Sequence, residues 1–230
     1  GVSVRYVTRR AELGTPDLLI LPGTKNTLSD LRWLRESGLE AAILKLHEKG
    51  CLLFGICGGF QMLGKQISDP EQTEGGGSLR GLGLLDMETI FQPQKHQQQV
   101  QGTIAEPSGV FAPLAGSAIT GYEIHMGETA LAGNALPLMQ LCKNGQYSAD
   151  GAVSEDGLVL GTYLHGLFDS DEFTRTLVNG LRERKGLAAL DGDFHYARYK
   201  TQQFDILAAS MRQHIDIEKI YTIMREHKEA

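Results

Sequence analysis

The sequence predicts an α/β fold: a three-layer sandwich with a mixed, mostly parallel central sheet. Short apolar runs, each long enough for one buried strand, alternate with stretches whose apolar residues recur every three or four positions. Glycine-containing turns directly follow several of the apolar runs. An order of strand, helix, strand and helix is typical of parallel strands joined by right-handed crossovers.

The first part of the chain supplies this alternation. The expected elements are a short strand over residues 2–7, a buried strand over residues 17–21, two helices between residues 26 and 50, a buried strand over residues 51–54 and a short helix through Leu63. Gly38 divides the two helices, because glycine breaks a helical pattern.

The remainder of the chain has a different pattern. The expected elements are a polar loop over residues 66–81, antiparallel segments at 84–91, 99–104 and 122–129, a buried strand over 158–164, helices around 172–185, 204–214 and 217–226, and a polar loop over 191–200. We expect residues 1–190 to form one domain and residues 191–230 to form a helical C-terminal extension packed on it.

Composition excludes several classes of partner. The chain has 22 Lys+Arg against 28 Asp+Glu and no basic block, so we expect no nucleic-acid partner. No apolar run approaches the ~18 residues of a membrane-spanning helix. Three scattered cysteines are too few for a disulfide framework or a zinc site, and they predict the reducing cytoplasm as the location.

The segment GICGG at residues 55–59 carries the strongest local signal. It lies between a buried strand and a helix, where a nucleophile elbow would place its reactive residue, here Cys57. We expect the following helix N-terminus to lower the pKa of the thiol and to direct N–H groups at an oxyanion. The alternative is a glycine-rich turn that holds an inert cysteine.

A thiol nucleophile needs a general base, and two histidines are candidates. His165 directly follows a predicted buried strand, and carboxyl ends of parallel strands meet in one crevice. His125 lies in a predicted strand, where the alternative is an imidazole that only packs. The PGTKNT segment at residues 22–27 also follows a strand: it either donates N–H groups to an oxyanion or is a simple connection capped by Thr24 or Asn26.

Three motifs in this order resemble the class I (triad-type) glutamine amidotransferase domain: a strand leading into PGT, then GICGGFQMLG, then YLHG. The resemblance covers Asp17 to about Asp169 and implies a flavodoxin-like sandwich. It implies that Cys57 is the nucleophile that attacks the side-chain amide of glutamine and that His165 is its base. It further implies an oxyanion hole made by Gly58 and by the turn at Gly23 and Thr24, and a glutamine pocket lined by Gln61.

One position departs from this family. Most members read His-x-Glu, with the glutamate orienting the histidine, whereas here Leu167 stands at the third position. The loss is similar to the branch of the family that contains corrinoid-amidating synthases and the peptidoglycan-amidating glutaminase. Tyr122, Glu123 and His125 are the candidates for orienting or pocket residues, and a group from a partner domain is the alternative.

Within that branch, the segments at residues 121–129 and 161–170 look most like the corrinoid-amidating synthases. The resemblance implies a glutaminase that needs no cofactor or metal of its own and supplies ammonia for a corrinoid carboxylate. Its partner is an N-terminal synthetase domain that binds ATP and Mg²⁺. The chain contains no Walker A motif, so we expect that domain to be absent from it.

Three alternatives stay open. The chain could serve amidation of the peptidoglycan precursor lipid II instead of a corrinoid. An incomplete triad could leave a glutamine-binding module without turnover. A cysteine hydrolase or protease on a similar sandwich also uses an elbow cysteine.

Overall fold

The computed structural model describes residues 2–143, 145–192 and 195–227. It forms two compact units, Gly1–Leu190 and Asp191–Ala230, which we describe separately. The helices of the first unit are α1 (Thr27–Glu36), α2 (Leu39–Glu48), α3 (Gly58–Leu63) and α4 (Asp171–Arg184), with the 3₁₀ turns η1 (Arg10–Glu12), η2 (Gly109–Leu114) and η3 (Leu167–Asp169). Its strands are β1 (Leu18–Leu21), β2 (Leu52–Ile56), β3 (Gln66–Asp69), β4 (Gly77–Arg80), β5 (Met87–Ile104), β6 (Ala118–Leu131), β7 (Met139–Lys143), β8 (Gln146–Asp150), β9 (Ala152–Val153), β10 (Val159–Thr162) and β11 (Leu164–His165).

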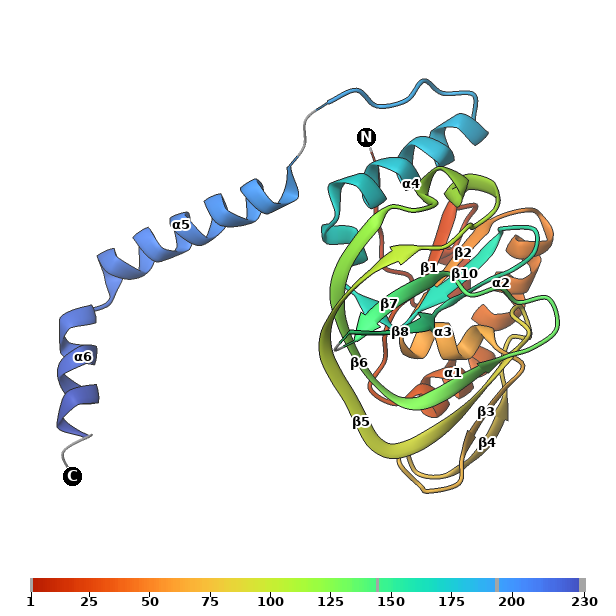
Figure 1. Cartoon of the computed structure of the whole chain (residues 1–230), viewed down its shortest axis with the longest axis horizontal. Coiled ribbons are helices and arrows are strands. Elements are labelled where there is room, and N and C mark those ends of the chain that lie inside the picture. Colours follow the sequence, from red (N-terminus) through yellow and green to blue (C-terminus); the bar gives the residue numbers. More distant parts are fainter. Residues whose placement is uncertain (1, 144, 193–194, 228–230) are drawn as a thin grey trace. The chain divides into compact units, whose positions relative to one another are not determined.

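A four-stranded sheet in the order β1-β2-β10-β9 forms the middle of this unit (Figure 1). Strands β1, β2 and β10 run parallel, and β9 is antiparallel to β10. Side chains of β2 alternate between two cores: Leu53 packs with α1, α2 and α3, whereas Leu52 and Phe54 pack with α4 and η2. This burial on both faces gives the three layers and confirms the predicted α/β sandwich.

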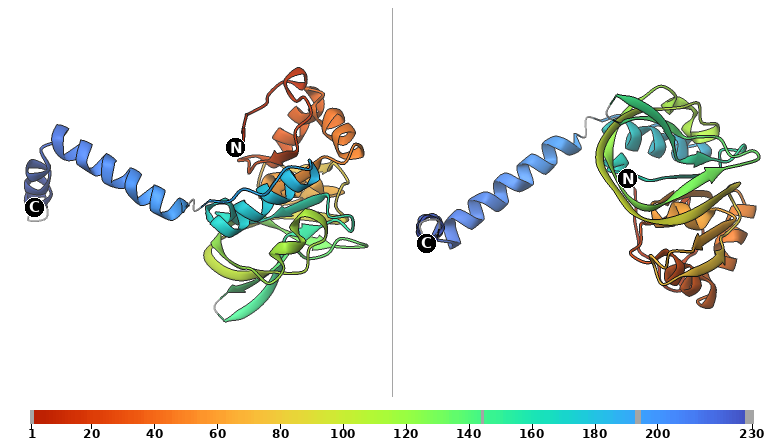
Figure 2. Two further views of the ribbon diagram at one scale, coloured as in Figure 1. Left: turned by 90° about the horizontal axis from the view of Figure 1, so that it is seen from above. Right: turned by 60° about the horizontal axis from the view of Figure 1, so that its bottom comes forward.

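The predicted antiparallel segments lie in a second sheet of seven strands, β11-β6-β5-β3-β4, in which β7 pairs with β5 and β8 pairs with β7. The segments predicted separately at 84–91 and 99–104 belong to one strand, β5. The longest pair of this sheet, β5 and β6, is a curved antiparallel ribbon that wraps around the side of the unit (Figures 1 and 2). The register shifts between Ile90 and Lys95, and such bulges bend a strand. Strand β11 joins this sheet by pairing with β6, which brings the end of the central sheet to the ribbon.

The second unit contains α5 (Tyr196–His214) and α6 (Ile217–Glu226). Asp216 caps α6 by accepting the Lys219 N–H at 3.0 Å. These two helices confirm the predictions at 204–214 and 217–226. However, α5 begins earlier than expected, inside the loop predicted at 191–200. Residues 193–194 of that loop lie outside the described residues. Throughout the described residues, no helix combines the length and apolar character needed to cross a membrane.

Other predictions for the first unit divide into two groups. The strands at 17–21 and 51–54 and the two helices are confirmed, and Gly38 joins the helices at φ 75°, a value that favours glycine. The strand predicted over residues 2–7 is wrong: this segment is largely exposed and pairs with no described strand. The predicted loop at 66–81 is instead the β3–β4 hairpin, anchored by the buried side chain of Ile67.

The strand predicted over 158–164 is divided between the two sheets. Strand β10 ends at Thr162, and β11 begins at Leu164 and pairs with β6. The hydroxyl oxygen of Thr162 accepts the Leu164 N–H at 2.9 Å, which turns the chain between the strands. A continuous apolar run contains no signal for such a change of sheet, because the side chains remain buried on both sides of it.

Candidate active site

Cys57 lies at the sharp turn between β2 and α3. Its backbone has φ 52° and ψ −113°, a conformation that side-chain-bearing residues rarely adopt. The turn is possible because its neighbours are glycines: a Cβ on Gly59 would lie 2.0 Å from the carbonyl oxygen of Leu21. The structure therefore has the strained elbow that the GICGG segment predicted.

Gly23 lies beside both Cys57 and His165. A Cβ on Gly23 would be 3.5 Å from Cβ of Cys57 and 3.6 Å from Cε1 of His165. His165 reaches this place from β11, which pairs with β6 such that His165 lies opposite Tyr122. The fold thus brings together the cysteine and the histidine that are 108 positions apart in the sequence.

The backbone of Gly58 lies against the turn that follows β1. A Cβ on Gly58 would be 3.2 Å from the Thr24 backbone nitrogen and 2.6 Å from Thr24 Oγ1. Two segments that carry backbone N–H donors therefore meet next to the thiol, as an oxyanion site requires. Of the two predicted caps for α1, Asn26 is the one that accepts a helix N–H, from Ser29 at 2.8 Å.

Both candidate catalytic groups favour their neutral forms. Burial raises the pKa of the Cys57 thiol, the Gly58 N–H partly offsets this, and the negative charge of Glu74 adds to it. The Gly58 N–H, at the start of α3, lowers this pKa in the expected direction, but desolvation outweighs it and the net pKa of the thiol is raised. Burial also lowers the pKa of His165, so its imidazole is available as a neutral base.

The His165 ring is held by two neighbours on β6. The ring of Tyr122 stacks on it, with centroids 5.3 Å apart and planes 7° from parallel. The carbonyl of Ile124 forms a hydrogen bond that raises the His165 pKa, although desolvation outweighs it. Nε2 of His165 is buried and has no hydrogen-bond partner among the described residues.

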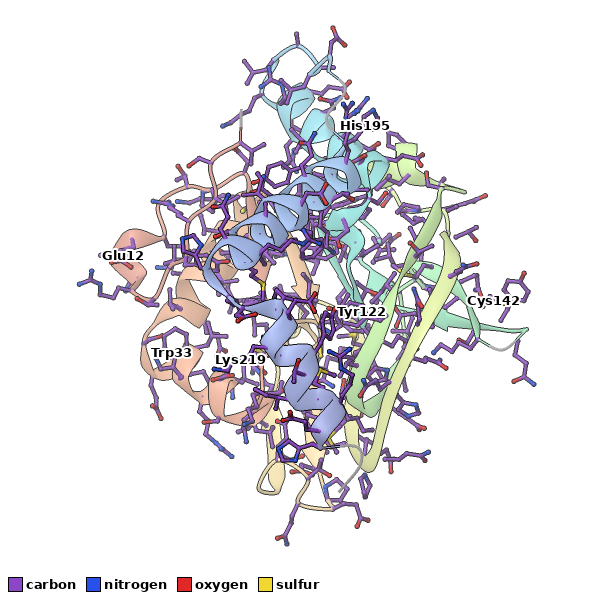
Figure 3. All side chains as sticks on the ribbon, turned by 90° about the vertical axis from the view of Figure 1, so that its left-hand side faces the viewer. Glu12, Trp33, Tyr122, Cys142, His195 and Lys219 are labelled. Atoms are coloured by element: carbon purple, nitrogen blue, oxygen red, sulfur yellow. The ribbon has the colours of Figure 1, made fainter. Side chains whose placement is uncertain are left out.

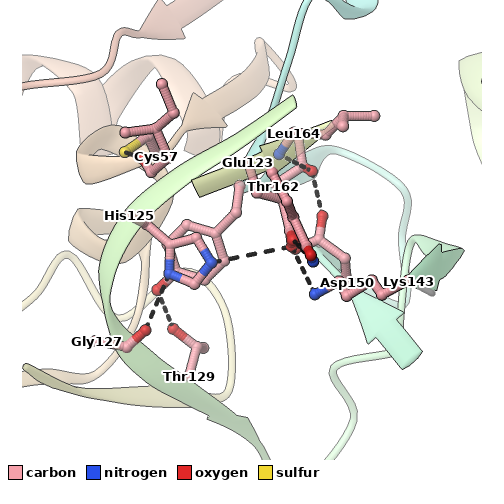
Figure 4. Close-up of polar contacts among 12 residues, drawn as sticks. Cys57, Glu123, His125, Gly127, Thr129, Lys143, Asp150, Thr162 and Leu164 are labelled. Carbon is pink, nitrogen blue, oxygen red and sulfur yellow. Dashed lines mark hydrogen bonds and ion pairs between the residues drawn. The ribbon is translucent and has the colours of Figure 1, made fainter. Parts of the chain in front are cut away.

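His125, the second candidate base, is engaged elsewhere. Its Nδ1 lies 3.0 Å from the carbonyl oxygen of Gly127, and its ring stacks on Tyr163 with centroids 3.8 Å apart (Figure 4). The ring of His96 stacks with it at 5.1 Å. These contacts correspond to the packing alternative for His125.

Glu123 forms a buried ion pair on the same ribbon. Its carboxylate accepts Lys143 Nζ at 2.8 Å and Gln98 Nε2 at 3.3 Å, and it lies 3.9 Å from His125 Nε2 (Figure 4). Burial opposes ionisation of Glu123, but the hydrogen bonds and the Lys143 charge prevail and bring its pKa to about 2. The side chain of Glu123 points away from His165 because side chains alternate between the two faces of a strand. Tyr122 contacts His165, so Glu123, the next residue along β6, points to the opposite face.

Leu167, at the position of the family glutamate, is a core residue. It is 3% exposed and packs in the same cluster as Phe173 and Leu177 of α4. A charged carboxylate at this place would be buried among apolar side chains.

Gln61 is buried beneath the nucleophile turn. Its Oε1 accepts the Thr27 hydroxyl at 3.0 Å, and its Nε2 donates to the Met126 carbonyl at 3.3 Å and to the Tyr163 hydroxyl at 3.2 Å. Burial raises the pKa of Tyr163 to about 12, so this hydroxyl is neutral. The side chain of Gln61 thus joins α1, β6 and the β10–β11 turn.

Two acidic residues near the site were not predicted from the sequence. Glu74, within the predicted loop, accepts the N–H groups of Thr27 and Leu28 at the start of α1, and its charge acts on the Cys57 thiol. Asp150 accepts a hydrogen bond from Thr162 beneath the site (Figure 4). No motif marks either residue, since each reaches the site only through a turn of the second sheet.

The other cysteines have different surroundings. Cys51 is buried, and its thiol lies 3.3 Å from the carbonyl oxygen of Pro16, so it serves as a packing residue. Cys142 is half-buried in β7, near the outer end of the β7–β8 hairpin (Figure 3). Cys142 therefore provides a natural control for thiol chemistry at Cys57.

Comparison with known proteins identifies relatives of this chain. A family model described as the CobB/CobQ-like glutamine amidotransferase domain matches residues 1–173. Over 229 residues the chain is 59% identical to a cobyric acid synthase of Citrobacter koseri and 57% identical to one of Salmonella arizonae. Each alignment covers 99% of this chain but 45% of the relative, so the chain spans about half the length of these proteins.

Solved structures share the fold at lower identity. One is a glutamine amidotransferase with a TM-score of 0.53 and 19% identity, covering 81% of this chain and 88% of that one. Another is PurLQS from Thermotoga maritima, with a TM-score of 0.56 and 17% identity, covering 79% of this chain and 85% of that one.

Proposed function

This chain belongs to the family of CobB/CobQ-like glutamine amidotransferase domains, and from that premise we propose that it hydrolyses glutamine and supplies the ammonia for amidation of corrinoid side-chain carboxylates. The observation that carries the proposal is the position of Gly23, where an added Cβ would touch both Cys57 and His165. A nucleophile and a base meet there beside backbone donors, which is the arrangement that acyl transfer requires.

In the proposed reaction, His165 takes the proton of the Cys57 thiol while sulfur attacks the amide carbon of the glutamine side chain. The N–H groups of Gly58 and of the Gly23–Thr24 turn stabilise the oxyanion. His165 then gives its proton to the departing nitrogen, and ammonia and a thioester result. Water, deprotonated by His165, attacks the thioester and releases glutamate and the free thiol.

The surroundings of the thiol also suit glutamine as substrate. Glutamine carries an ammonium group, and the charge of Glu74 is felt at Cys57. The half-buried Glu74 carboxylate is fixed by the Thr27 and Leu28 N–H groups. We propose that Glu74 contributes electrostatically to binding the substrate ammonium.

The next part of the proposal concerns how the His165 imidazole is held in place. We propose that the Ile124 carbonyl and the Tyr122 ring hold the His165 imidazole, since Leu167 leaves no carboxylate at the family position. A neutral hydrogen bond stabilises imidazolium less than a carboxylate does. The proposal therefore includes a slow glutaminase in the absence of a partner.

The corrinoid acceptor is supported by the relatives named cobyric acid synthase. Because those proteins are about twice as long, we propose that ATP and Mg²⁺ act at a synthetase domain that lies in the part of the relatives not matched here. No cofactor or metal is proposed for this domain, since each step above uses only its own side chains and backbone N–H groups, together with water. We propose the cytoplasm as its location, where glutamine and ATP are available.

Glutamate release from glutamine tests the enzymatic part of the proposal. Cys57→Ser is expected to abolish it, and Cys142→Ser is the matched control that retains it. A diazoketone analogue of glutamine is expected to alkylate Cys57, and glutamine is expected to slow this labelling by competing for the site. Absence of both turnover and labelling would favour a non-catalytic module, and labelling that glutamine does not slow would favour a cysteine hydrolase.

A reconstitution tests the acceptor. The chain is combined with the unmatched portion of the Citrobacter koseri relative, ATP, Mg²⁺ and a corrinoid with free carboxylates, and amide formation is followed by mass spectrometry. Glutamine-dependent amidation is expected with wild type and not with Cys57→Ser. Amidation of lipid II by its synthetase, but not of the corrinoid, would assign the chain to the peptidoglycan pathway.

A further inference from the structure

Thr162 forms hydrogen bonds with the backbone next to both candidate catalytic residues, Cys57 and His165. It is the last residue of β10 and is fully buried. Its carbonyl oxygen accepts the Cys57 N–H at 2.9 Å, and its Oγ1 accepts the Leu164 N–H, also at 2.9 Å. Because Leu164 directly precedes His165, one residue is bonded to the nucleophile and to the strand of the base.

Asp150 orients the hydroxyl of Thr162. It is the last residue of β8, in the second sheet, and its Oδ2 accepts the Thr162 O–H (Figure 4). A hydroxyl has one proton and two lone pairs, so donation to Asp150 leaves a lone pair directed at the Leu164 N–H. The Asp150–Thr162 bond therefore joins the central sheet to the second sheet at the point where β10 becomes β11.

Close backbone approach supports this junction. Gly151, next to Asp150, has φ 68°, and a Cβ there would lie 2.5 Å from the carbonyl oxygen of Gly161. The turn after β8 is thus packed directly on β10. A side chain at Gly151 would separate the two sheets and with them Asp150 and Thr162.

A carboxyl group such as that of Asp150 is unusual at a buried position. It is 7% exposed and lies near Glu123, Lys143 and His125, whose charges act on it. Burial raises the pKa of Asp150, in part offset by the hydrogen bond from Thr162. Burying a carboxyl group destabilises the fold more than burying an apolar side chain of similar size would. We therefore look for the role of the Asp150–Thr162 hydrogen bond in the groups that it orients.

We propose that Asp150 and Thr162 are positioning residues that set the placement of the Cys57 thiol relative to the His165 imidazole. This inference rests on the proposed glutaminase function. Neither side chain contacts the thiol or the imidazole; both act through the Cys57 N–H and the Leu164 N–H. The contact replaces in part the rigidity that a triad carboxylate would give.

Substitution of Thr162 tests the proposal. Thr162→Val keeps the shape but removes Oγ1, so the Leu164 N–H loses its acceptor. Misplacement of a catalytic group by about 1 Å can cost ~10²-fold in rate, and we expect kcat for glutamine hydrolysis to fall about 10- to 100-fold. KM is expected to stay within about twofold, because Gly58 and Thr24 are untouched, and Thr162→Ser is expected to restore kcat to within about threefold.

Two further variants separate positioning from stability. Thr174→Val is the matched control, since it removes a hydroxyl that donates to the Phe168 carbonyl at 3.0 Å and is expected to leave kcat unchanged. Asp150→Leu is expected to lower kcat as Thr162→Val does. The Asp150→Leu/Thr162→Val double variant is expected to be no slower than either single one, because both remove the same contact.

The outcomes are distinguishable. Wild-type kcat in Thr162→Val, corrected for the folded fraction, overturns the inference, as does a Thr162→Ser variant as slow as Thr162→Val. If Thr162→Val does not fold, Asp150→Leu decides, because leucine cannot accept the Thr162 O–H: a lower kcat at native Tm supports the inference, and an unchanged kcat overturns it.

Failure of the proposed function would be seen separately, as a wild-type chain that hydrolyses no glutamine. The inference is then decided by the rate at which iodoacetamide alkylates Cys57, which requires no glutamine. We expect Thr162→Val to change that rate at least about threefold and Thr174→Val to leave it unchanged. Equal rates in the two variants overturn the inference.

Discussion

The thiol of Cys57 donates a hydrogen bond to the carbonyl oxygen of Ile124, with 3.4 Å between Sγ and O. The same carbonyl bonds the His165 ring. The resting thiol proton is therefore held by the main chain of β6, and burial favours the neutral forms of both candidate catalytic groups. In the proposed reaction, proton transfer to His165 is then coupled to attack on the substrate instead of preceding it.

Alkylation of Cys57 by iodoacetamide should show this neutral resting state. Only the thiolate reacts, and burial raises the thiol pKa above its ordinary value of 9.0, so the rate is expected to keep rising with pH past that value. Peptide mass spectrometry measures the rate, with the denatured chain as reference. Glu74→Gln removes a negative charge and is expected to move the profile to lower pH; a wild-type plateau below about pH 7 would instead indicate a thiolate–imidazolium pair.

Gly58→Ala is expected to disable the oxyanion site while the fold survives. The new Cβ would meet Thr24 Oγ1 at 2.6 Å and the Thr24 nitrogen at 3.2 Å, so the donor turn is displaced. Loss of one oxyanion donor costs about 10²- to 10³-fold in kcat, measured as glutamate release. Gly192→Ala is the control, because a Cβ there meets nothing within 4 Å, and wild-type kcat in Gly58→Ala would contradict the assignment.

Restoring the family glutamate at Leu167 is expected to destabilise the protein. The side chain is 3% exposed in an apolar cluster, so Leu167→Glu buries a carboxyl without a partner and costs about 3 kcal/mol of unfolding free energy. Leu167→Met should cost less than about 1.5 kcal/mol. Urea denaturation measures both, and a stable, faster Leu167→Glu enzyme would show that the glutamate can reach His165 after all.

The Glu123–Lys143 pair should make stability depend on pH in the acid range. The pKa of Glu123 in the folded chain is about 2 against an ordinary value of 4.5, so its contribution to the free energy of unfolding is fully present above pH 4.5 and is lost as pH falls toward 2. Lys143→Met leaves the buried carboxylate without its cation, and we expect a loss of ~2 kcal/mol at neutral pH and less at acid pH. Lys185→Met, which breaks the exposed pair with Asp17, should cost under about 1 kcal/mol, and an equal loss in both variants would contradict the burial argument.

Glu123→Gln is expected to retain kcat within about fivefold, because Lys143 and Gln98 hold this carboxylate on the face of β6 opposite to the Tyr122–His165 contact. The pH profile of glutamine hydrolysis is the measurement, with Cys57→Ser as the inactive reference. A fall of more than about 100-fold would assign Glu123 the orienting role instead.

Short sequence patterns predicted the turns correctly where the backbone conformation depends on residues next to one another in the chain. Gly38 separates α1 from α2 because of its positive φ, and the glycines around Cys57 permit the elbow. The β3–β4 hairpin and the break between β10 and β11 had no such signal. In those places Ile67 and Thr162 are fixed by partners on another strand, Leu79 and Asp150, each twelve positions away.

By itself, the sequence determined the α/β class, the elbow and the two residues most suited to nucleophile and base, since each depends on residue types at short spacing. Only the tertiary structure decided what surrounds them. It buried Leu167, turned Glu123 toward Lys143, brought Glu74 to the site and set Asp150 beneath Thr162. These outcomes depend on the pairing of strands far apart in the chain and on the desolvation that follows, and neither is encoded in any single segment.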